Sequence, residues 1–223
     1  MKNETVVRQI PIQMTGYYCL QEPENKYAGP PSVLIALHGF GQKCKGFMRH
    51  FTTLANRNIL VVAPQGPHQF YMQLDPKKVG FNWLTIYEKG NSIRDFNGFM
   101  QRLIDEIEQT HRVTRDRIFL LGFSQGVSMA YRFAVSGEIA PRGLIACCSD
   151  LPADVADRLG EVSPFPVLIA HATDDPLILP SKADDAESRL CAAGYPVERL
   201  AYTGGHTITE EAVARIGDWI ASR

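Results

Sequence analysis

The amino-acid sequence predicts an α/β fold with a mostly parallel central sheet and helices on both of its faces. Short apolar runs alternate along the chain with longer segments in which apolar residues recur every three or four positions, as in parallel strands joined by crossover helices. The runs contain almost no polar positions, which is expected of strands covered on both faces. A single domain spanning residues 1–223 is expected, because α/β folds often exceed about 200 residues without dividing.

Six runs are predicted to be strands: residues 33–38, 59–63, 118–122, 143–148, 167–171 and 197–202. The last of them is more polar than the others. Ahead of these runs, residues 5–20 read as two extended pieces broken at Thr15 and Gly16, which predicts an antiparallel hairpin at one edge of the sheet. The sheet is therefore expected to be mixed.

The clearest predicted helix spans residues 92–112, where Phe96, Met100, Leu103 and Ile107 follow a helical period and Ser92 is a candidate N-cap. Similar patterns predict helices over residues 46–56, 125–136, 181–193 and 207–221. Between the second strand and the clearest helix, residues 64–91 form the one long segment without a periodic pattern. Loops of this length are often functional.

Three aromatic residues, Phe81, Trp83 and Tyr87, give this long loop an apolar character. Such side chains are suited to lining a pocket, and Trp83 is the candidate for contact with a substrate. The alternative is that the aromatic residues only pack the loop onto the body of the protein.

The composition is that of an ordinary globular protein, with 45% apolar and 21% charged residues. A formal net charge of −1 provides no basic field that would attract nucleic acid or anionic lipid. We expect a cytoplasmic protein without stable membrane insertion, because no signal-like run and no apolar span of about 20 residues occurs. The five cysteines are odd in number and scattered, so neither a disulfide framework nor a zinc site is expected.

Residues 122–126 read Gly-Phe-Ser-Gln-Gly and stand between a predicted strand and a predicted helix. A tight strand-to-helix turn of this kind holds a serine hydroxyl above the sheet, and glycines flank it because side chains would clash with the crowded backbone. The amino end of the following helix can stabilise an oxyanion. Ser124 is therefore the candidate nucleophile, and a structural glycine turn is the alternative.

A serine hydroxyl is a weak nucleophile, so a nearby base must accept its proton. In this type of fold the acid and then the histidine follow the serine along the chain. Downstream of Ser124 stand His171 and His206. We interpret His206 as the base, because a Thr-Gly-Gly loop delivers it after the last predicted strand, and His171 as a structural residue at its own strand end.

The residue that orients this base is a choice among three aspartates. Asp174 and Asp175 follow the strand at residues 167–171, and Asp150 follows the preceding strand. Both loops belong to the sheet edge where open α/β sheets bind ligands. The residues alone leave the choice open.

Oxyanion stabilisation requires a second backbone donor from the loop after the strand at residues 33–38. There the chain reads His-Gly-Phe-Gly, and the two glycines would allow the N–H of Phe40 to turn toward the serine. It would act together with the N–H of Gln125, the residue after the nucleophile. A plain glycine-rich turn is the alternative.

In these motifs and their order, nearly the whole chain resembles the phospholipase/carboxylesterase family of small α/β-hydrolases, which includes bacterial carboxylesterases and acyl-protein thioesterases. The matching segments are residues 37–41, 122–126, 128–130, 171–180 and 205–206. The resemblance implies Asp175 as the acid, because the family's acid stands directly before a Pro-Leu-Ile segment, and it supports Phe40 and Gln125 as oxyanion donors.

The function expected from this resemblance is hydrolysis of carboxylic esters through Ser124, His206 and Asp175 and an acyl-enzyme, without a metal or organic cofactor. The substrate is expected to be a small-molecule acyl ester. At 223 residues there is little room for a lid domain, so we expect an open cleft. Gln42 and Asp150 depart from the family pattern in substrate-contacting loops, so the preferred acyl chain is not predicted. Neither are the enantioselectivity and the oligomeric state.

Two alternatives use the same scaffold. An acyl-protein thioesterase or a lysophospholipase would use the same residues on another leaving group, and an apolar rim near Phe70, Tyr71 and Met72 would favour the lysophospholipase. A non-catalytic module would keep the fold as a ligand receptor, because fold alone does not determine function.

Overall fold

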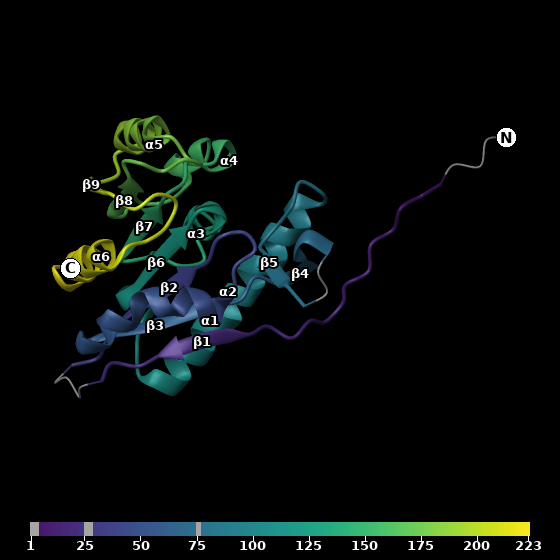
Figure 1. Ribbon diagram of the computed structural model, residues 1–223. Helices are drawn as coiled ribbons and strands as arrows, with labels where there is room; N and C mark the ends of the chain where they lie inside the picture. Colours follow the sequence, from purple (N-terminus) through teal and green to yellow (C-terminus); the bar gives the residue numbers. More distant parts are fainter. Residues whose placement is uncertain (1–4, 25–28, 75–76) are drawn as a thin grey trace.

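The computed structural model describes residues 5–24, 29–74 and 77–223, and its main feature is a seven-stranded sheet (Figure 1). The strands are β1 (Tyr18–Gln21), β2 (Ser32–Leu37), β3 (Ile59–Pro64), β6 (Ile118–Phe123), β7 (Gly143–Cys147), β8 (Val167–Ala172) and β9 (Val197–Tyr202). Their order across the sheet is β1-β3-β2-β6-β7-β8-β9. Only β1 runs antiparallel to its neighbour, so the predicted mixed, mostly parallel sheet is confirmed.

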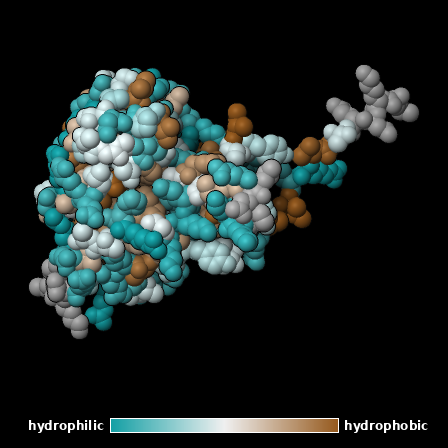
Figure 2. All heavy atoms as spheres, viewed as in Figure 1, coloured by the Kyte–Doolittle hydropathy of each residue, from teal (hydrophilic) through white to brown (hydrophobic). Residues whose placement is uncertain are grey.

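All six apolar runs that predicted strands are strands, with bounds that agree to within one residue. The predicted hairpin before them is wrong. Only Tyr18–Gln21 pairs with β3, and residues 5–17 belong to no strand. In Figures 1 and 2 the amino end of this segment projects from the body, while Gln9 donates to the side chain of Glu88 at 3.3 Å. Its apolar side chains, among them Ile10 and Ile12, are exposed. Pro11 between them has no N–H to offer to a ladder of strand hydrogen bonds.

Helices cover both faces of the sheet, as predicted (Figure 1). They are α1 (Cys44–Phe47), α2 (Lys89–His111), α3 (Gln125–Ala134), α4 (Ala153–Ala156), α5 (Pro180–Ala192) and α6 (Glu210–Ala221), with 3₁₀ segments at Met48–Asn56, Met72–Leu74, Arg115–Arg117 and Leu159–Glu161. Alternate residues of β2 point to opposite faces. Val33 and Ile35 pack in one core with residues of α2, α3 and α5, while Leu34 and Ala36 pack in a second core with residues of α6.

Two helix predictions need correction. The predicted helix over residues 46–56 is α-helical only at its start and continues as 3₁₀ turns from Met48. The helix predicted from Ser92 begins earlier, at Lys89, after Glu88 adopts a left-handed conformation with φ 48°. The carbonyl of Glu88 accepts the N–H groups of Asn91 and Ser92, so Ser92 lies inside the first turn and is not the N-cap.

The described residues between 64 and 91 contain regular structure that the sequence did not predict. They contain a two-stranded antiparallel sheet of β4 (His68–Tyr71) and β5 (Val79–Asn82), in which His68 pairs with Asn82. Periodicity did not reveal these strands because each has only four residues. Among the described residues, no helix is long and apolar enough to cross a membrane.

Candidate active site

Ser124 lies at the carboxyl end of β6, where the strand turns directly into α3. Its backbone has φ 52° and ψ −120°, a strained conformation for a residue other than glycine, and its N–H donates to the carbonyl of Cys147 at 3.0 Å. A Cβ on Gly122 would lie 2.3 Å from the Cα of Val127, and one on Gly126 would lie 2.1 Å from the carbonyl oxygen of Leu37. The tight turn therefore requires both glycines of the Gly-x-Ser-x-Gly motif.

Three side chains from three loops form one chain of hydrogen bonds at this edge. The Oγ of Ser124 lies 3.0 Å from Nε2 of His206, and Nδ1 of the same ring lies 2.8 Å from Oδ2 of Asp175. Asp175 follows β8 and His206 follows β9, so parallel strands bring their carboxyl ends together. The side chain of Asp175 has no exposed surface, whereas 17% of the His206 side chain is exposed.

Further hydrogen bonds hold the carboxylate of Asp175. Its Oδ1 accepts the backbone N–H groups of Leu177 and Ile178 at 2.8 and 3.0 Å. Burial alone would raise the pKa of this carboxyl. The hydrogen bonds from Ile178, His206 and Leu177 outweigh burial, so the pKa of Asp175 lies below its usual value. The group is an anion at neutral pH and can orient the Nδ1–H of His206.

Asp174 has a different role from its neighbour. Its Oδ1 accepts the N–H groups of Gly204 and Gly205 at 2.8 and 3.0 Å, in the loop that precedes His206. These two backbone hydrogen bonds lower the pKa of the Asp174 carboxyl. Asp150, the third candidate acid, is exposed and takes no part in the described hydrogen bonds of this group.

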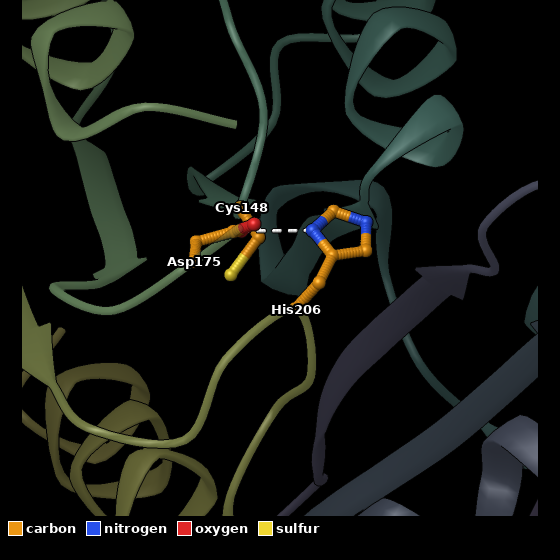
Figure 3. Close-up of side chains that lie close together, drawn as sticks. All are labelled: Cys148, Asp175 and His206. Atoms are coloured by element: carbon orange, nitrogen blue, oxygen red, sulfur yellow. Dashed lines mark hydrogen bonds and ion pairs between the residues drawn. The ribbon is translucent and has the colours of Figure 1, made fainter. Parts of the chain in front are cut away.

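A thiol lies beside the acid and the histidine, as Figure 3 shows for Cys148, Asp175 and His206. One donor atom from each of these side chains lies within 4.8 Å of the others, close enough for a metal ion to bridge them. In this structure the carboxylate and the imidazole are instead hydrogen-bonded to each other. Burial, the largest effect, raises the pKa of the Cys148 thiol, so the protonated thiol is favoured in this arrangement.

The same thiol belongs to a network that fixes the loop after His206. The hydroxyl of Tyr202 donates to the carbonyl of Thr207 at 2.7 Å, and the Sγ of Cys148 lies 3.1 Å from that hydroxyl. Thr207 directly follows His206. The histidine is therefore held on one side by Asp174 and on the other by Tyr202.

Of the two candidate oxyanion donors, Phe40 lies in the loop after β2, and Gln125 directly follows Ser124 as the first residue of α3. Within the described residues, neither the N–H of Phe40 nor that of Gln125 donates to a protein acceptor. The left-handed conformation of Gly41, with φ 77°, shapes the first loop, and the N–H of Gly41 donates to Phe81 at 2.8 Å. Both donors are thus free for a ligand.

His38 supports the same loop from below. Its Nδ1 lies 2.8 Å from the carbonyl of Gly39, and its Nε2 accepts the N–H of Gly66 at 2.9 Å. Burial lowers the pKa of His38 to about 4, so the ring is neutral at physiological pH. The side chain of Gln65 lies 2.7 Å from the same Nε2, and Gln42 accepts the N–H of Gly39 at 2.8 Å. Sequence reasoning noted Gln42 only as a departure from the family pattern and assigned no role to Gln65, because a side-chain amide leaves no periodic signal.

Trp83, the predicted substrate contact, is fully buried. Its indole N–H donates to the carbonyl of His38 at 2.8 Å. Its backbone N–H donates to the side chain of Gln125 at 3.1 Å, and that side chain also donates to the carbonyl of Leu84 at 3.0 Å. Trp83 therefore packs beneath the oxyanion loop, and its contact with a substrate stays a prediction that would require the loop to move.

His171 has the structural contact that the sequence suggested, because its Nε2 lies 2.9 Å from the carbonyl of Ile178 in the loop that follows its strand.

Exposed apolar side chains also occur in the loops of the site. Phe40 is 58% exposed and stacks on Phe70 at 4.9 Å, and Leu177 and Leu179 are 70% and 64% exposed. These side chains offer apolar surface in the loops that carry the serine's partners.

The chain is similar to known proteins. The family model described as phospholipase/carboxylesterase matches residues 21–222. A protein named acyl-protein thioesterase 1 from Debaryomyces hansenii is 27% identical over 169 residues, which cover 66% of this chain and 71% of the relative.

Two solved structures have the same fold. The crystal structure of esterase PE8 has a TM-score of 0.74 at 18% identity and covers 94% of this chain and 99% of its own. The crystal structure of Zea mays acyl-protein thioesterase 2 has a TM-score of 0.72 at 19% identity. The match covers 93% of this chain and 99% of the Zea mays chain.

Proposed function

Because this chain belongs to the phospholipase/carboxylesterase family of α/β-hydrolases, we propose that it is a serine hydrolase that cleaves carboxylic esters through an acyl-enzyme on Ser124. The observation that carries the proposal is the continuous hydrogen-bonded chain from Ser124 through His206 to Asp175. A serine, a base within hydrogen-bonding distance and a carboxylate behind the base are what nucleophilic acyl transfer requires.

In the first step, Oγ of Ser124 adds to the ester carbonyl carbon while Nε2 of His206 accepts the hydroxyl proton. Asp175 stabilises the imidazolium that forms. The tetrahedral oxyanion receives hydrogen bonds from the N–H groups of Phe40 and Gln125, whose unused donors support this role. His206 then returns the proton to the leaving alcohol, and the acyl group stays on the serine.

In the second step, water attacks the acyl-enzyme. His206 accepts a proton from the water, a second tetrahedral intermediate forms at the same oxyanion donors, and its collapse releases the carboxylic acid. The proton then passes from His206 to Oγ of Ser124, so each turnover consumes one ester and one water and restores the enzyme. These steps need only side chains and backbone groups that the chain itself supplies.

Acyl thioesters are a second candidate substrate class. Two observations favour them: the names of the Debaryomyces hansenii and Zea mays proteins, and the exposed apolar side chains of Phe40, Leu177 and Leu179, which offer surface to an acyl chain. The chemistry at Ser124 would be the same, with a thiol as the leaving group.

The proposed serine hydrolase is a single domain with an open site and a cytoplasmic location.

Two matched substrate series test the proposal. One series consists of p-nitrophenyl esters of increasing acyl length, and the other of thioesters with the same acyl chains. We expect hydrolysis by the wild type and loss of activity in Ser124→Ala for both series. Higher kcat/KM for the thioesters would favour the second class. Absence of hydrolysis in both series would overturn the proposed function and leave the binding-module alternative. Undiminished activity of Ser124→Ala would overturn it by showing that another residue carries the reaction.

A further inference from the structure

A cavity of about 340 Å³ lies far from the candidate active site and is lined by four arginines. They are Arg57, Arg117, Arg142 and Arg223, and none of the nine lining residues is acidic. We call this feature the arginine cavity. Four arginines among nine lining residues are unusual in a chain whose net charge is −1, because like charges repel one another unless something neutralises them.

The parallel strands determine where the arginine cavity lies. Arg117 directly precedes β6, Arg142 directly precedes β7, and Arg57 stands two residues before β3. The cavity therefore forms at the amino ends of these strands, whereas Ser124 and His206 stand at the carboxyl ends. The fourth arginine, Arg223, follows α6, which packs on the same side as the 3₁₀ segment that ends before Arg57.

Two of the arginines are held by carboxylates that do not line the cavity. Nη1 of Arg57 lies 2.7 Å from Oδ1 of Asp218, which is mostly exposed. Arg223 pairs with Glu198, and its guanidinium stacks 3.9 Å above the ring of Trp219. These contacts orient the two side chains and neutralise part of their charge.

The other two arginines have less compensation. Arg117 donates from Nε to the carbonyl of Pro31 at 3.0 Å, and within the described residues its two Nη atoms have no carboxylate partner. Arg142 forms no side-chain hydrogen bond or ion pair with a described residue. Asp116 is a carboxylate that interacts electrostatically with both arginines. Its pKa is lowered mainly by a hydrogen bond from Thr114 and further by Arg117 and Arg142. Asp116 is exposed and does not line the cavity.

We propose that the arginine cavity binds a small multivalent oxyanion. The planar guanidinium fork matches the oxygens of phosphate and carboxylate groups, and several forks around one hollow favour a ligand with more than one negative charge. A volume of about 340 Å³ is at the small end of ligand pockets, so the ligand is of the size of pyrophosphate or citrate. Both share the chemistry of clustered anionic oxygens.

Calorimetric titration of the purified wild-type chain with pyrophosphate, and separately with citrate, tests the inference at constant ionic strength. Thermal unfolding with and without each anion provides a second readout. The variants are Arg117→Gln and Arg142→Gln. Arg102→Gln, on the exposed face of α2, is the matched control because it removes the same charge away from the cavity.

We expect saturable binding of at least one of the two anions, with a raised melting temperature, and affinity about tenfold lower or more in each cavity variant but unchanged in Arg102→Gln. Binding of pyrophosphate alone would identify phosphate as the ligand chemistry, and binding of citrate alone would identify carboxylate. Without an anion, Arg142→Gln should melt no lower than the wild type, because it removes a repulsive charge. The inference is overturned if neither anion binds, or if Arg102→Gln weakens binding as much as the cavity variants. Ester hydrolysis by Ser124 is not used in any readout, so this result is independent of the proposed function.

Discussion

Asp174 and Asp175 are neighbours in the chain and hold the same histidine by different routes. Asp175 lies 2.8 Å from Nδ1 of His206 and can orient the ring directly. Asp174 instead accepts the N–H groups of Gly204 and Gly205, so it fixes the backbone that carries His206. Asp174 lies in a turn closed by the N–H of Asp175 and the carbonyl of Ala172 at 3.3 Å, and the two carboxylates bind different groups, so one acidic pair serves both purposes.

This division of roles predicts different losses of activity. Asp175→Asn should lower kcat by roughly 10³- to 10⁴-fold, because an amide cannot stabilise the imidazolium. Asp174→Asn keeps an oxygen acceptor for the two glycines, so its kcat should stay within about tenfold of the wild type. Steady-state hydrolysis of one p-nitrophenyl ester by both variants measures this. Equal losses in the two variants would contradict the assignment.

The hydroxyl of Tyr202 is expected to position His206 through its neighbour Thr207. Tyr202→Phe removes the 2.7 Å hydrogen bond to that carbonyl, and we expect kcat to fall by about three- to thirtyfold with little change in KM. Tyr195→Phe is the matched control, because its hydroxyl donates to Leu159 at 2.9 Å, away from the site. The control should lose stability only. A similar fall in kcat for both variants would argue against the positioning role.

The glycine after the candidate nucleophile is expected to tolerate no side chain. Gly126→Ala would place a Cβ 2.1 Å from the carbonyl oxygen of Leu37, so the variant should lose about 2 kcal/mol or more of unfolding free energy, or fail to fold. Gly46→Ala, in α1, has no atom within 4 Å of the added Cβ and should be neutral or slightly stabilising. Urea denaturation of the two variants tests the contrast, which fails if they are equally stable.

The neutral state of His38 predicts a specific loss of stability in acid. Burial lowers the pKa of His38 from 6.5 to about 4, so the unfolded chain binds more protons than the folded chain between these values. The contribution of neutral His38 to the unfolding free energy should therefore be complete above about pH 6.5. It should fall by on the order of 3 kcal/mol as the pH drops toward 4. Carboxylates with a lowered pKa, such as Asp154 at about 2, make the unfolding free energy depend on pH only below about pH 4.

Urea denaturation at pH 7.5 and pH 4.5 measures this loss. His38→Gln removes the titrating ring, so its unfolding free energy should be lower than that of the wild type at pH 7.5 but should change much less between the two pH values. An identical pH dependence in the wild type and the variant would show that other groups cause the acid loss.

The parallel strands and the order of the three candidate active-site residues can be predicted from the sequence, because buried strands are continuous apolar runs and their carboxyl ends share one edge. The Gly-x-Ser-x-Gly motif is informative for a steric reason, since Gly122 and Gly126 both lie against backbone atoms. Side-chain amides carry no such signal. The contacts of Gln42, Gln65 and Gln125 depend on loops that meet only in the folded chain.

The errors, and the features that the residues alone left open, also have physical causes. The alternating apolar residues before β1 suggest a strand, yet no neighbour pairs with them in this structure, and apolar pattern alone cannot supply a partner. The choice between Asp174 and Asp175 depends on the direction of each side chain, which residue type does not encode. The sequence did not predict the arginine cavity, because Arg57, Arg117 and Arg142 precede different strands and come together only in the folded chain.

Covalent labelling tests the central claim most directly. The wild-type chain is treated with a fluorophosphonate, digested, and the modified peptide is located by mass spectrometry. A single phosphonate on Ser124, absent from Ser124→Ala and formed far more slowly in His206→Asn, is the result that the account predicts. A chain that hydrolyses esters while Ser124 stays unmodified, or a label on another residue, would contradict it.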